Sequence, residues 1–182
     1  MWRVIMAVVS ACLIAPFVSF GHSLDTVRMD AAAMFGIPEE RYSMTFQSGR
    51  VLNAHTGDMV NGTFQRTFIE LECGTFESHY RMQVQNSIMR PMTVSTIFHE
   101  FGHAAVREHG IWRRSESEYT EEQFVEKLAF QMMWNSGYWW NAIHMSFMHS
   151  FGGKPREYRA PATIWSTIFT GKNAVKSSAS YF

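Results

Sequence analysis

Two histidines four residues apart, His99 and His103, most constrain what this 182-residue chain can fold into, because they stand inside a stretch that is apolar at helical spacing. The apolar positions of that stretch are Val94, Ile97, Phe98, Phe101, Ala104 and Ala105. Pro91 suits the first turn of a helix, and His109-Gly110 suits its end. We therefore predict a helix over 93–108 that starts near Pro91. Residues four apart on a helix project from the same face, so both imidazoles can reach one metal ion.

A glutamate directly follows the first histidine and completes the pattern His99-Glu100-x-x-His103. Histidines at this spacing on a helix are ligands that zinc prefers, and the adjacent glutamate is placed to act on a metal-bound water. The pattern is typical of zinc metallopeptidases. We therefore predict His99 and His103 as Zn²⁺ ligands and Glu100 as the catalytic general base.

A catalytic zinc site needs a third protein ligand, and His109 is one candidate by spacing. For His109 to turn back toward the metal, the helix would have to stop near position 106 in a left-handed turn. Val106 is β-branched and suits positive φ poorly, so we expect the helix to continue through it. His109 would then stay on the helix surface, although it remains an alternative ligand.

The other candidates lie at the start of the next predicted helix. Thr120 and Gln123 form a capping box, which predicts a helix beginning at Glu121. Glu122 then stands nineteen residues after His103, and Glu126 lies one turn further along the same face. The helical wheel places Glu121 nearer the apolar arc than Glu122, so Glu121 is a second possible ligand. A third interpretation is that these glutamates are simply a favourable acidic first turn.

The residues from His99 to Ala129 resemble a group of uncharacterised bacterial metallopeptidases of the gluzincin-like zincins. Their signature is HExGHA, a loop, and then EExxADxxA, which His99–Ala104 and Glu121–Ala129 match. The resemblance implies that His99, His103 and Glu122 bind Zn²⁺, and that the acid one turn later holds a ligand histidine by its other ring nitrogen. This chain departs from the signature at Glu126, where the family has aspartate, and in a longer loop.

The rest of the chain predicts one α+β domain with a small antiparallel sheet and a helical half that carries the metal site, and the resemblance implies that this domain is zincin-like. Strand-like segments occupy 41–74, with turn signals at 56–58 and 61–62 and the best strand at 68–71, which we expect at the sheet edge beside the cleft. The predicted helices, besides the one described above, are Leu24–Phe35, Glu121–Trp134, Tyr138–Ser150 and Pro161–Phe169. Gly102 is expected to let its helix approach a neighbour closely, and His144 to be a core or surface histidine or to line the cleft.

The N-terminal segment resembles a secretory signal. Arg3 precedes an uncharged apolar run over 4–20, and small residues precede a cleavage position ahead of His22. We therefore predict a signal peptide at 1–21, a metallopeptidase-like domain at 22–182, and a secreted or periplasmic location. An uncleaved membrane anchor and lipid attachment at Cys12 are the alternatives.

Charge and cysteine content narrow the classes of function. Lys and Arg together number 16, Asp and Glu also number 16, and no basic run occurs, so nucleic acid is not an expected partner. Cys73 is the one cysteine after the predicted signal, which excludes an internal disulfide or a thiolate metal cluster in the mature domain. We predict a zinc-dependent metallopeptidase with a peptide or protein substrate; the alternative is a zinc-stabilised binding domain without catalytic activity.

Overall fold

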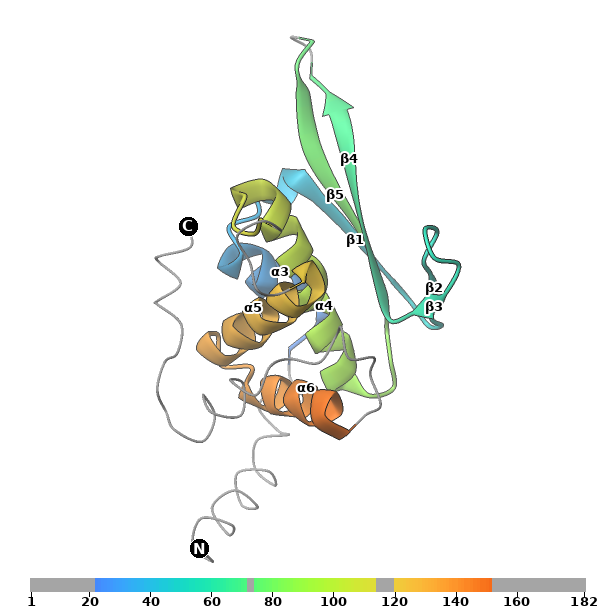
Figure 1. Ribbon diagram of the computed structural model, residues 1–182, viewed down its shortest axis with the longest axis vertical. Helices are drawn as coiled ribbons and strands as arrows, with labels where there is room; N and C mark the ends of the chain where they lie inside the picture. Colours follow the sequence, from blue (N-terminus) through green and yellow to red (C-terminus); the bar gives the residue numbers. More distant parts are fainter. Residues whose placement is uncertain (1–21, 72–73, 114–119, 152–182) are drawn as a thin grey trace, which may run out of the picture.

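The computed structural model describes residues 22–71, 74–113 and 120–151 (Figure 1). Its elements, in chain order, are α3 (Leu24–Met34), the 3-10 helix η1 (Glu39–Arg41), β1 (Tyr42–Gln47), β2 (Val51–Leu52), β3 (Met59–Val60), β4 (Gly62–Glu70), β5 (Phe76–Gln85), α4 (Arg90–His109), α5 (Glu121–Asn135) and α6 (Trp139–Phe151). The predicted signal segment, Cys12, Cys73 and the predicted helix at 161–169 lie outside the described residues. No helix of the described part is long and apolar enough to span a membrane.

The four helices lie within one or two residues of their predicted bounds, because local signals set their ends. Ser23 caps α3 by accepting a hydrogen bond from the backbone N–H of Thr26 at 3.0 Å. The predicted capping box is present at α5, where Thr120 and Gln123 bond each other's backbone N–H groups. α4 continues through Val106 and ends at Gly110, whose φ of 60° is left-handed.

The main sheet has three strands in the order β1-β5-β4 and is mixed, which corrects the expected antiparallel sheet. β4 and β5 form a long antiparallel hairpin that extends past the helices in Figure 1. β1 pairs with β5 in parallel, from Tyr42 opposite Tyr80 to Gln47 opposite Gln85. A parallel pair needs a crossover connection, which here is the chain from β2 through β4. Of the predicted strand at 68–71, residues 68–70 form the distal end of β4, which is an edge strand of the described sheet as expected.

α4 is the central element of the core and packs against α3, α5, α6, β4 and β5. Side chains on one face of β5 and one stripe of α4 bury each other, among them Tyr80, Met82, Val84, Ile97, Phe98 and Phe101, none more than 1% exposed. The buried positions recur every two residues on β5 and every three or four residues on α4. This is the spacing expected of a strand and a helix that pack against one core.

Gly102 sets how closely α5 approaches α4. A Cβ at this position would lie 2.8 Å from Cγ1 of Val125 on α5. Any larger residue would therefore push the two helices apart, which confirms the close packing expected of this glycine. The same crossing brings the first turn of α5 against His99 and His103.

Candidate metal centre

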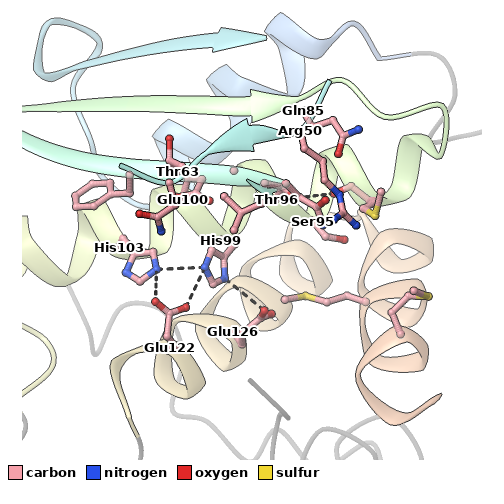
Figure 2. A pocket seen from close by; sticks show the side chains of 18 of the residues that line it. Arg50, Thr63, Gln85, Ser95, Thr96, His99, Glu100, His103, Glu122 and Glu126 are labelled. Carbon is pink, nitrogen blue, oxygen red and sulfur yellow. Dashed lines mark hydrogen bonds and ion pairs between the residues drawn. The ribbon is translucent and has the colours of Figure 1, made fainter. Parts of the chain in front are cut away.

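Three side chains from α4 and α5 converge on one point. His99 and His103 turn their Nε2 atoms toward each other at 3.2 Å. The Glu122 carboxylate faces both, with Oε2 3.4 Å from Nε2 of His99 and Oε1 3.4 Å from Nε2 of His103. These three residues form a group that could hold a metal ion, and they are the three predicted ligands (Figure 2).

The spacing of the two imidazole nitrogens fits a small tetrahedral ion, and one ligand atom from each of His99, His103 and Glu122 lies within 4.8 Å of the others. Zinc binds imidazole nitrogen and carboxylate oxygen at about 2.0–2.1 Å, so two ligand atoms at a tetrahedral angle lie about 3.3 Å apart. The two imidazole nitrogens, 3.2 Å apart, are close to that value, and each has a different oxygen of the Glu122 carboxylate at 3.4 Å. Two imidazoles and one carboxylate are also the donor set of catalytic zinc sites that keep a fourth position open.

Each candidate ligand histidine has a carboxylate at its other ring nitrogen. Oε1 of Glu126 lies 3.5 Å from Nδ1 of His99, and Oε1 of Glu121 lies 3.0 Å from Nδ1 of His103. The second oxygen of Glu121 accepts a hydrogen bond from Arg107 at 2.8 Å. Carboxylates in this position fix the tautomer and orientation of a ligand histidine. Glu121 therefore contacts Nδ1 of His103, on the side away from the cluster of Nε2 atoms. The alternative that Glu121 is the third ligand, which the helical wheel allowed, does not fit this position.

His109 does not join the cluster. Its Nε2 donates a hydrogen bond to the backbone carbonyl of Phe35 at 2.9 Å, at the end of α3. This contact follows from the helix continuing through Val106, as the sequence predicts. His109 thus connects α4 to α3 and has no place among the candidate ligands.

Glu100 lies on the strand side of the histidines, opposite Glu122 (Figure 2). It is 4% exposed, and this burial raises the pKa of its carboxyl, which the two histidines partly oppose. Gly62 of β4 passes directly over it, so that a Cβ at this position would lie 2.4 Å from Oε1 of Glu100. A buried carboxyl with a raised pKa, beside a metal site, suits proton transfer.

Without a metal ion, the pKa values of His103, Glu121 and Glu122 are shifted by their contacts with one another. Burial alone would lower the pKa of His103, but hydrogen bonds to Glu121 and Glu122 outweigh it and raise that pKa to about 10. The pKa of Glu122 lies well below its usual range, since its bonds to the two histidines overcome its burial. The same balance lowers the pKa of Glu121, through His103 and Arg107. The site therefore favours positive charge, as a cation site must.

The cluster opens into a cleft of about 1020 Å³ that β4, α4 and α6 enclose with the β2–β3 hairpin. Phe64 on β4 stacks on the His103 ring, with 5.6 Å between centroids. His144 on α6 also lines the cleft, and burial lowers its pKa. The expected strand beside the cleft is thus the same β4, but its first residues line the cleft, whereas Phe68 lies toward the tip of the hairpin.

Sequence reasoning missed Gly62, Arg50 and the other cleft residues before β4. Asn61-Gly62 is wrongly predicted as a turn, because Gly62 begins β4 and its φ is not positive. The central strand β5 was also missed, although its buried residues alternate with polar ones. That alternation was the one signal that could have found it.

Comparison with protein-family models, curated proteins and solved structures finds no match for this chain.

Proposed function

We propose that this chain is a zinc-dependent metallopeptidase of the zincin type, and that its N-terminal segment directs it to secretion. One observation carries the proposal: Nε2 of His99, Nε2 of His103 and the Glu122 carboxylate face one another at 3.2–3.4 Å, with Glu100 buried beside them. The predicted sequence motif supports the same assignment, as does the resemblance to gluzincin-like metallopeptidases.

The proposed mechanism divides the work among the cluster residues. When bound, zinc lowers the pKa of a coordinated water and polarises the carbonyl of the scissile peptide bond. Glu100 accepts the proton of the attacking water and passes it to the leaving amine. Its raised pKa favours holding that proton between the two steps. Glu121 and Glu126 keep the imidazoles turned so that both Nε2 atoms remain available to the metal.

The position of β4 suits the binding of an extended peptide. β4 lies at the edge of the described sheet, and its first residues, Gly62–Phe64, line the cleft beside Glu100. An edge strand presents backbone N–H and C=O groups with which a peptide can pair. A peptide held in this way would bring its carbonyl past the metal cluster.

Replacement of Glu100 by glutamine tests the proposal. The variant should bind zinc at one equivalent and should cleave peptides at least about a hundredfold more slowly, because an amide cannot accept the proton. Glu70→Gln, an exposed site on β4 away from the cleft, is the matched control and should keep full activity. Zinc is measured by elemental analysis, and cleavage with a peptide library.

Three outcomes contradict the proposal. If protein reconstituted with zinc holds none, the metal assignment fails. If Glu100→Gln binds zinc and cleaves as fast as the parent, the role of Glu100 fails. One equivalent of zinc with no cleavage of any peptide by the parent would instead favour the zinc-stabilised binding domain.

A further inference from the structure

Four methionines line the cleft together with the metal cluster, and we call the part of the cleft that they line the arm. Met59 on β3, Met92 at the start of α4, and Met145 and Met148 on α6 all face this arm. Methionine is flexible and polarizable, so a surface of this kind adapts to large apolar side chains of different shape. The mechanism proposed above uses none of the four.

The arm follows one stripe of α4 from the metal toward the helix N-terminus. Met92, Thr96 and His99 lie four and three residues apart and all line the cleft. At 1.5 Å per helical residue, Met92 is about 10 Å from His99 along the axis. An extended peptide advances about 3.3 Å per residue, so the arm accommodates about three residues of substrate.

Arg50, immediately before β2, is the charged residue of this arm. The cleft's carboxylates all lie at the metal end, and its other arginine, Arg107, is paired with Glu121. Among the described residues, no carboxylate lies within ion-pair distance of Arg50. In Figure 2 the Arg50 side chain reaches from the hairpin toward Ser95 of α4, over the arm. Arg50 is exposed to solvent at the mouth of the cleft, and its guanidinium can pair in a bidentate way with an anion that enters.

We propose that Arg50 binds a carboxylate of the peptide substrate within about three residues of the scissile bond, and that the methionines hold apolar side chains between the two. This inference rests on the proposed peptidase function and names its substrate class. The carboxylate is either the peptide C-terminus or an aspartate or glutamate side chain, because a guanidinium pairs with both in the same way.

Four peptides of one apolar sequence test the inference. They end in a free carboxylate or an amide, and carry Glu or Gln at the third position after the scissile bond. The parent should cleave the charged peptides about ten- to a hundredfold more efficiently in kcat/KM than the doubly neutral one. Arg50→Gln should abolish that preference, and Arg50→Lys should keep part of it. Arg81→Gln, on β5 and outside the cleft, is the matched control and should change nothing.

Binding supplies a readout that does not need turnover. The same peptides are titrated calorimetrically into zinc-loaded Glu100→Gln, with and without Arg50→Gln. Preference for the free C-terminus or for Glu identifies the source of the carboxylate. Equal kcat/KM and equal affinity for charged and neutral peptides overturn this inference and leave the peptidase function standing. Absence of cleavage by the parent overturns the function, while the titrations still decide whether Arg50 selects a carboxylate.

Discussion

Replacement of Gly62 by alanine tests whether β4 positions Glu100, the proposed general base. The added Cβ would lie 2.4 Å from Oε1 of Glu100 and 2.5 Å from Cγ2 of Thr96, where ordinary contacts are at least 3.4 Å. The Thr96 side chain cannot rotate freely, because its hydroxyl donates to the backbone carbonyl of Met92 at 2.9 Å. The Glu100 carboxylate must therefore shift by about 1 Å.

The expected cost follows from these two contacts. Overpacking of a buried site destabilises by about 1–3 kcal/mol. In a domain of this size, each kcal/mol lowers Tm by roughly 2–4 °C, so the loss in Tm is roughly 2–12 °C. Misplacement of a catalytic group by about 1 Å can cost about a hundredfold in rate. We expect kcat/KM to fall by about that factor while zinc remains bound.

Gly49→Ala is the matched control, because nothing lies within 4 Å of a Cβ at that position. It should keep the Tm and the activity of the parent. The double variant Gly62→Ala/Thr96→Ser removes the second contact but not the first, so it should recover part of the loss in Tm and none of the loss in kcat/KM. The assays are thermal unfolding, zinc content and cleavage of one peptide. If Gly62→Ala keeps both its Tm and its kcat/KM beside the Gly49 control, the reasoning is refuted.

Three further predictions concern the cluster and its support. The pKa of metal-free His103 is raised to about 10, so zinc must displace the proton of His103 at any pH below that value. The zinc affinity measured by calorimetry should therefore rise about tenfold per pH unit from pH 7 to 9. An affinity that does not change with pH would contradict the coupling of His103 to Glu122. Thr120→Ala removes the side-chain cap of α5, and it should lower the free energy of unfolding in urea by about 1 kcal/mol and weaken zinc binding. An unchanged free energy of unfolding would show that the cap is unimportant. Tyr80→Phe deletes the hydrogen bond from the tyrosine hydroxyl to the Glu108 carboxylate at 2.5 Å. It should lower the free energy of unfolding in urea by about 1.5–3 kcal/mol and leave the zinc content unchanged. A loss of zinc would show that this hydrogen bond is coupled to the metal cluster.

Local signals explain why the helices and the candidate ligands could be predicted. A capping box, a proline in the first turn and a glycine after the last turn fix helix ends within a few residues of sequence. Two histidines four apart must share a helix face wherever that helix packs. The choice between Glu121 and Glu122 was different, because a helical wheel orders residues only against their own helix. It does not say at what angle α5 crosses α4, and that angle decides which glutamate reaches the Nε2 atoms.

The sheet depended on contacts distant in sequence. β1 and β5 pair in parallel although about forty residues separate Tyr42 from Tyr80, and no turn signal reports such a pairing. Gly62 was missed for the same reason. Asn-Gly is a common hairpin turn, and only the packing of β4 over α4 shows that this glycine is needed for close approach to Glu100.

Two glycines on opposite sides of α4 connect the fold to the proposed chemistry. Gly102 lets α5 approach until Val125 occupies the space that a side chain at position 102 would need, and in this arrangement Glu122 lies 3.4 Å from both imidazoles. Gly62 lets β4 descend onto the other side, which buries Glu100 and raises its pKa. The spacing of the histidines alone fixes two ligands. The third ligand and the environment of the base depend on how closely the neighbouring elements approach, and that closeness requires a residue without a side chain at each crossing.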